Sequence, residues 1–220
     1  MLLLQRVVHQ LLMLLLRAGK VNINDERIDD NTCRLLVSDG YYAELVVSDR
    51  AVVIYKLLDG ACLVEDEDAI LTVLRADAGN TASLIAGVDM SELIASFQDD
   101  NYYALVGHLF AHGGDPDTLL NNYVNLACAR HMALDPVFDT MNPDQRGKIM
   151  EKLLEGGSSD GRVVISVFNA RNGEIDSFVQ EIGLTELREA WSGDEQAEIM
   201  VLVYQHSAAN QLAVLRDASS

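Results

Sequence analysis

The hydrophobic residues of this chain fall into short runs that are separated by small acidic or glycine-containing clusters. Residues 2–18 repeat apolar side chains with the 3.6-residue period of an amphipathic helix, and Gly19 ends this pattern. Six apolar side chains share the face that we expect to meet the core: Leu4, Val7, Val8, Leu11, Leu14 and Leu15. The pattern therefore predicts a helix over residues 2–18.

The next three hydrophobic runs are dense in Val, Leu, Ile and Tyr, and they cover residues 33–38, 41–47 and 51–57. Short polar breaks of hairpin length separate them, namely Ser38-Asp39-Gly40 and Ser48-Asp49-Arg50. This spacing predicts three consecutive antiparallel strands.

An acidic cluster, Glu65-Asp66-Glu67-Asp68, leads into another apolar segment and predicts a helix over residues 66–78. Three further strands are predicted at 82–87, 92–97 and 102–110. Asp115 and Pro116 then have the residue types of a helix cap and first turn, which predicts a closing helix to about residue 133. The expected fold class is α+β: helix, three strands, helix, three strands, helix.

The chain changes character near Leu134-Asp135-Pro136, so we expect a first domain over residues 1–135 and an additional α/β segment over 136–220. Asn142-Pro143 opens a predicted helix that stops at Gly156. Beyond it, residues 163–168 resemble a strand and 174–191 a helix, whereas 197–205 fit either. The sequence assigns no role to this second segment.

The charge of the chain limits the classes of partner that it is expected to bind. Lys and Arg total 16 against 34 Asp and Glu, and no basic run occurs, which argues against nucleic-acid binding. The apolar run at residues 11–16 is shorter than a membrane span and is flanked by Gln10 and Arg17, so no membrane insertion is expected. Cys33, Cys62 and Cys128 are odd in number and lack metal-type spacing, which favours a reducing cytoplasm.

No catalytic constellation stands out in the sequence. His108 and His112 are four residues apart, but the predicted strand end and Gly-Gly turn would separate their side chains. Asp115 is better explained as a helix cap than as a phosphoryl acceptor, and Cys128 as a small core residue rather than as the partner of His131. Trp191 is interpreted as a packing anchor. We therefore expect that the protein is not an enzyme and that it binds neither a cofactor nor a metal ion.

Three segments carry a resemblance to a known family. They are Asp29–Asp39, Ser48–Tyr55 and Leu120–Ala127, which are similar to a polar turn with its strand, a third strand and a closing helix. In this order they resemble the class I chaperones of bacterial type III secretion (the Tir-chaperone family). The resemblance implies a bacterial cytoplasmic homodimer that binds the N-terminal segment of a secreted effector without ATP and keeps it export-competent.

Candidate residues follow from this interpretation. Val46, Val52 and Ile54 lie on predicted strands, where an extended effector segment could add to an open sheet edge, although simple burial explains them as well. The resemblance places the dimer interface on helix 66–78 and strand 102–110, with these residues: Ile70, Val73, Tyr102, Ala104 and Val106. Two alternatives stay open. One is a regulatory adaptor that binds a transcription or secretion regulator through 136–220, and the other is an enzyme with an unrecognised site.

Overall fold

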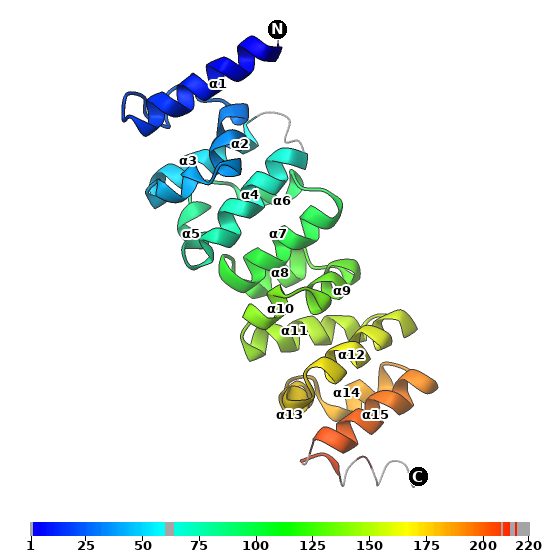
Figure 1. Cartoon of the computed structure of the whole chain (residues 1–220). Coiled ribbons are helices and arrows are strands. Elements are labelled where there is room, and N and C mark those ends of the chain that lie inside the picture. The colour runs from blue at the N-terminus through cyan, green and yellow to red at the C-terminus, as the bar shows by residue number, and fades with distance from the viewer. Residues whose placement is uncertain (1, 60–63, 208, 212–213, 215–220) are drawn as a thin grey trace. The chain divides into compact units, whose positions relative to one another are not determined.

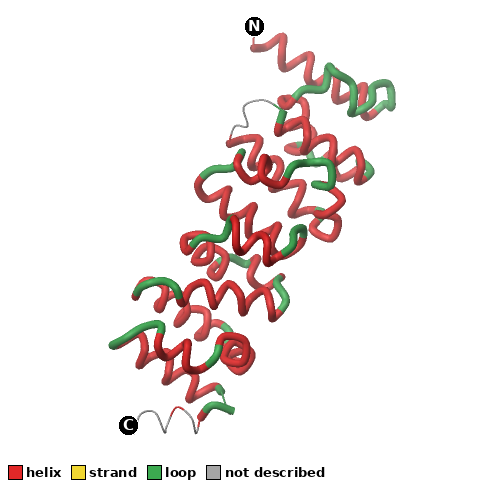
Figure 2. Tube along the Cα trace, turned by 180° about the vertical axis from the view of Figure 1, so that it is seen from behind, coloured by secondary structure: helices red, strands yellow, loops and turns green. Residues whose placement is uncertain are grey.

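A computed structural model describes residues 2–59, 64–207, 209–211 and 214, with only the backbone described for residues 2–6 and 9. Over these residues the chain consists of helices joined by loops, and no segment is a strand (Figure 2). The chain divides into two compact units, Met1–Gly113 (unit 1) and Gly114–Ser220 (unit 2). The boundary expected near residue 135 falls inside unit 2.

Unit 1 is coloured blue to green in Figure 1 and is built around α2 and α4. Its elements are α1 (Leu2–Arg17), α2 (Asp30–Ser38), η1 (Tyr41–Glu44), α3 (Val47–Leu58), α4 (Val64–Ala76), η2 (Ala78–Asn80), α5 (Thr81–Leu84), α6 (Met90–Ala95) and α7 (Asp99–His112). Helix α2 packs against α1, α3 and α4, and α4 also packs against α3 and α7. Leu36, Ile54, Ile70 and Leu105 are fully buried between these helices.

Unit 2 is coloured green to red in Figure 1 and is organised around α11 and α12. Its elements are α8 (Pro116–Asn122), α9 (Leu126–Leu134), α10 (Val137–Thr140), α11 (Pro143–Leu154), α12 (Ser158–Ala170), η3 (Asn172–Glu174), α13 (Ile175–Ile182), α14 (Leu184–Glu189) and α15 (Asp194–His206). Helix α11 packs against α9, α12 and α13, while α12 packs against α9 and α15. Phe168 and Phe178 stack in its core with ring centroids 5.8 Å apart.

The expected α+β fold is wrong, because all the predicted strands are helical or lie in loops between helices. Residues 33–38 belong to α2, 51–57 to α3 and 102–110 to α7, and residues 163–168 lie in α12. The ambiguous stretch 197–205 lies in helix α15. The predicted helices at 2–18 and 66–78 are confirmed as α1 and α4, and that opened by Asn142-Pro143 as α11.

The spacing of the buried residues explains why Val-rich and Ile-rich runs form helices here. In α2 the buried apolar side chains are Cys33, Leu36 and Val37, which follow the i, i+3, i+4 spacing of one helical face. In α3 the buried residues Val53, Ile54 and Leu57 lie at i, i+1 and i+4, which also share one helical face. A strand would have buried alternate residues instead. The tertiary packing of these faces overrides the strand preference of β-branched side chains.

The polar clusters expected as hairpin turns lie at helix ends instead: Ser38-Asp39-Gly40 closes α2, and Ser48-Asp49-Arg50 lies in the first turn of α3. Asp29 caps α2 by accepting a hydrogen bond from the Thr32 backbone N–H, and Asp89 caps α6 by accepting from Ser91 and Glu92. Asn125 caps α9, and therefore the closing helix predicted from 116 to 133 is two helices, α8 and α9. The predicted cap at Asp115 is confirmed, since its side chain accepts from Thr118 N–H at 3.0 Å.

The packed face of α1 differs from the predicted one. Leu12, Met13 and Leu16 are buried, whereas four residues of the expected core face are 46–61% exposed: Val7, Val8, Leu11 and Leu14. Residues 11–16 of α1 are all apolar, so the sequence pattern in this half of the helix does not determine which side meets α2. Consequently one apolar face of α1 is left exposed by the described part of unit 1.

A polar tie fixes the start of α12 in unit 2. The Asp160 carboxylate is fully buried and accepts hydrogen bonds from Nε and Nη2 of Arg130 on α9. Trp191, which follows α14, is almost fully buried and donates from Nε1 to the Gly157 carbonyl at 3.1 Å. Gly156 passes so close to Asp160 that an added Cβ would lie 1.9 Å from Oδ2. These contacts join α9, α12 and the segment before α15.

Candidate protein-binding groove

A groove of about 410 Å³ opens between α2 and α4 in unit 1. Helix α4 contributes residues at i, i+3, i+4 and i+7, which share one face of a helix. The lining side chains are Arg34, Leu35, Val37, Ser38, Glu65, Asp68, Ala69 and Thr72. We refer to this feature as the α2–α4 groove.

The α2–α4 groove has an apolar floor and a polar rim. Val37 and Ala69 are buried and Leu35 is partly exposed, so the lower part of the groove is hydrophobic. Glu65 and Asp68 are exposed along the α4 side. A ligand that buries apolar surface here would also meet two carboxylates.

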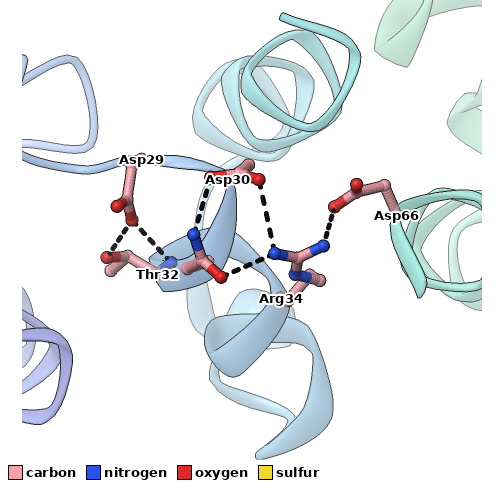
Figure 3. Close-up of polar contacts among 6 residues, drawn as sticks. Asp29, Asp30, Thr32, Arg34 and Asp66 are labelled. Atoms are coloured by element: carbon pink, nitrogen blue, oxygen red, sulfur yellow. Dashed lines mark hydrogen bonds and ion pairs between the residues drawn. The ribbon is translucent and has the colours of Figure 1, made fainter. Parts of the chain in front are cut away.

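Arg34 holds the two walls of the groove together (Figure 3). Its Nη1 atom lies 3.0 Å from Oδ1 of Asp66, which is 1% exposed in the first turn of α4. Its Nη2 atom donates to Asn31 Oδ1 at 2.6 Å and to Asp30 Oδ2 at 3.3 Å within α2. The guanidinium charge is therefore shared among carboxylates of the protein itself, and Arg34 acts as a tie between helices.

A second set of hydrogen bonds, from α7, holds the acidic rim of the groove in place. Asn101 on α7 donates from Nδ2 to Glu67 Oε2 and to Asp68 Oδ1, both at 3.1 Å. Glu67 is 2% exposed, so this amide satisfies a buried carboxylate and orients the neighbouring exposed one. The rim of the groove is thus held by a network that spans α2, α4 and α7.

The electrostatics of the groove favour a cationic ligand. Unit 1 contains 17 Asp and Glu residues against 8 Lys and Arg, counted over residues 1–113. Glu65 is exposed, and its carboxylate has no ion-pair partner in the described part of the chain. A summed negative field over a partly apolar groove raises the local concentration of basic partners and disfavours acidic ones.

The structure does not bring the sequence-predicted binding residues to this groove. Val46 is the exposed N-cap of α3, Val52 is partly exposed, and Ile54 is buried in the core of unit 1. With no strand in the described residues, there is no sheet edge among them to which a peptide could add. The predicted strand addition at these three residues is therefore wrong.

The residues predicted for a dimer interface lie on α4 and α7. Ile70, Val73 and Val106 have no exposed surface and pack within unit 1. Tyr102 and Ala104 are partly exposed on α7. The groove itself was not predicted, although the spacing of Glu65, Asp68, Ala69 and Thr72 places these four residues on one face of the predicted helix.

Comparison with known proteins assigns no family. No protein-family model matches the chain, and neither the curated proteins nor the solved structures contain a match. Among the described residues, no helix is both long and apolar enough to span a membrane.

His108 and His112 lie closer together than the sequence indicated. Both are on α7, one turn apart, with ring centroids separated by 4.9 Å. His108 is buried, and its Nε2 atom lies 2.8 Å from Thr81 Oγ1. Within the described residues, no group of three or more His, Cys, Asp or Glu side chains is arranged to hold a metal ion. His108 therefore belongs to the packing between α5 and α7, and His112 packs beside it.

The environment of His108 makes the stability of unit 1 depend on pH. Burial, followed by the charges of His112 and Arg75, lowers the His108 pKa from 6.5 to about 4. Because the folded state binds this proton less readily than the unfolded state, stability is full above pH 6.5 and is lost as pH falls toward 4. Between pH 7.5 and 5 we expect a loss of about 2 kcal/mol from this residue.

Urea unfolding at pH 7.5 and pH 5 measures this effect. His108→Gln should reduce the loss of stability between the two pH values, because the neutral amide does not titrate. His206→Gln, at an exposed position at the end of α15, is the matched control and should leave the difference unchanged. If wild type and His108→Gln lose the same stability between these pH values, the role assigned to His108 is contradicted.

The described cysteines are poorly suited to nucleophilic chemistry. Burial raises the pKa of the Cys33 and Cys128 thiols to about 12, so both are protonated near neutral pH. Cys128 packs against Met132, with 3.5 Å between the sulfur atoms, and His131 lies near Asp135 instead. Cys62, the third cysteine, lies outside the described residues. The Cys33 and Cys128 thiols are buried packing groups of the hydrophobic core.

Proposed function

We propose that this chain is a non-enzymatic protein-binding module whose α2–α4 groove receives a basic, amphipathic segment of another protein. The observation that carries the proposal is the combination of an open apolar floor with the exposed carboxylates of Glu65 and Asp68. The Arg34–Asp66 tie supports it, because a groove whose walls are already fixed loses little entropy when a ligand binds.

The shape of the groove favours a helix as the bound segment. Two packed helices leave a furrow into which a third helix can place its apolar side chains, a common mode of peptide recognition. A volume of about 410 Å³ accommodates a few such side chains. Lysine or arginine residues flanking them would reach the carboxylate rim.

The proposal retains one part of the sequence-based hypothesis and changes another. Keeping the N-terminal segment of a secreted effector export-competent in the bacterial cytoplasm remains our proposal for the biological role. The mode of binding changes from strand addition to insertion in a groove between helices. The adaptor alternative, in which residues 136–220 bind a regulator, concerns unit 2 and is separable from the groove.

Charge reversal in the groove tests the proposal. The ligands are synthetic peptides that cover the N-terminal segments of proteins encoded beside this gene, with binding measured by isothermal titration calorimetry. We expect at least one peptide to bind, and Glu65→Lys with Asp68→Lys to weaken it tenfold or more, since two attractive contacts become repulsive. Raising the salt concentration should also weaken wild-type binding.

A matched control separates the groove from net charge. Asp59→Lys with Glu92→Lys changes the charge of unit 1 by the same amount, at exposed positions around a different hollow. This double variant should bind within about twofold of wild type, as expected for charges that act mainly through a screened field. Equal weakening by both double variants, or the absence of binding by every peptide, would overturn the proposal.

A further inference from the structure

Helix α1 presents an apolar face that the described part of unit 1 does not cover. Val7, Leu11 and Leu14 follow one another at i, i+4 and i+7, with Val8 beside them, and each is about half exposed or more. The opposite side of α1 is used, because Leu12, Met13 and Leu16 are buried where α1 packs on α2. A stripe of this kind has the spacing of a helix that packs into a groove between two others.

The charge of this segment is opposite to that of the rest of the chain. Residues 1–24 contain Arg6, Arg17 and Lys20 and no Asp or Glu, whereas the whole chain has a net charge of −18. Arg17 is paired with Asp39 at 2.7 Å, which fixes the end of α1 against the end of α2. The first helix is therefore both basic and amphipathic, as the α2–α4 groove requires of its ligand.

The exposed face of α1 cannot occupy the α2–α4 groove of its own chain. The core contacts of Leu12, Met13 and Leu16 hold α1 on α2, and in this position its other face is exposed while the groove stays open. A second copy supplies both missing surfaces. Contacts of this reciprocal kind close a two-fold dimer.

We propose that the exposed face of α1 from one copy occupies the α2–α4 groove of a second copy, so that the chain forms a reciprocal dimer. In this dimer the first helix competes with the partner segment for the groove. The inference uses the groove of the proposed function, but it rests separately on the exposure and charge of α1.

Two single variants and their mixture test the dimer. Leu11→Asp places a charge on the exposed face of α1, and Thr72→Arg places a long cation in the groove. Both positions are exposed, so circular dichroism should show an unchanged helix content. By sedimentation velocity at tens of micromolar, wild type should have twice the monomer mass and each variant the monomer mass.

The mixture identifies which surfaces meet. The Leu11→Asp protein keeps its groove and the Thr72→Arg protein keeps its α1, so an equimolar mixture should form a dimer through one contact. A mixture that stays monomeric would show that α1 does not enter the groove, and pairing between two α1 helices would then explain any wild-type dimer. Val201→Asp, on the exposed face of α15, is the matched control and should remain dimeric.

The outcomes also separate this inference from the proposed function. A monomeric wild type whose groove still binds effector-segment peptides would overturn the dimer and leave the function standing. A dimer restored by mixing, together with no binding of any effector segment, would support the dimer and overturn the function. A synthetic peptide of residues 1–20 should compete with effector segments for the wild-type groove, and failure to compete would contradict the shared site.

Discussion

An aspartate in place of Val106 is expected to unfold unit 1. Val106 has no exposed surface on α7, so the new carboxylate would be buried without a partner. Substitutions of this kind cost about 4–5 kcal/mol or more, which is comparable with the whole stability of many domains. Far-UV circular dichroism should show a loss of helix, and hydrogen exchange should become fast over residues 1–113.

The same substitution at Val46 provides the control. Val46 is 63% exposed at the N-cap of α3, where it makes no capping hydrogen bond. Aspartate is a favoured N-cap residue, so Val46→Asp should change stability by no more than about 1 kcal/mol, and in the stabilising direction. If Val106→Asp kept its helices and only dissociated a dimer, Val106 would belong to an interface, as the sequence analysis predicted.

Replacing Asp160 with asparagine is expected to have the largest effect of any single charge change in unit 2. The fully buried Asp160 carboxylate receives two hydrogen bonds from Arg130, and the loss of its charge weakens both. Breaking a buried ion pair costs about 3–5 kcal/mol. Because the Arg130 side chain is 38% exposed and can reach water, we expect about 2 kcal/mol in urea unfolding.

The pH dependence of this variant gives an independent check. The Arg130 hydrogen bonds hold the Asp160 pKa below 3.8, so the ion pair stabilises the fold above that pH and is lost as pH falls through the lowered pKa. The stability difference between wild type and Asp160→Asn should therefore shrink in acid. Asp117→Asn, which removes an exposed partner of Lys148, should cost less than about 1 kcal/mol, and an equal cost for both variants would contradict the argument.

The sequence predicted the helices that carry explicit start signals. Asn142 with Pro143 opens α11, where Asn142 and Gln145 form a reciprocal capping box. The acids before Ala69 correctly indicated α4. These signals are local, because a cap is satisfied by backbone N–H groups only two or three residues away, and they are therefore readable without knowledge of the fold.

The same local chemistry misled the assignment of strands. Asp and Ser residues favour both tight turns and helix N-caps, since in each case the side chain accepts a bond from a nearby backbone N–H. Asp29 begins the segment that resembles a polar turn, and Ser48-Asp49-Arg50 has the length of a hairpin turn, so the apolar runs beside them fit the length of strands. The spacing of Cys33, Leu36 and Val37 was the contrary signal.

The groove could not be predicted because it depends on how two helices pack. Residues 33–38 were expected in a strand, so Arg34 had no reason to lie beside Asp66, a residue far along the chain. The packing of α2 against α4 in the folded chain brings Arg34 beside Asp66. The acidity of the α4 stripe was visible in the sequence, whereas the wall opposite it was not.

The position of Trp191 gives the chain a built-in optical reporter. It is the only tryptophan in the sequence, and it is buried in unit 2 with its indole N–H bound to the Gly157 carbonyl. Emission excited at the tryptophan band therefore follows unit 2 alone, while far-UV signals sum the helices of both units. Unfolding around Asp160 should shift the emission maximum to longer wavelength, whereas unfolding confined to unit 1 should leave the emission maximum unchanged.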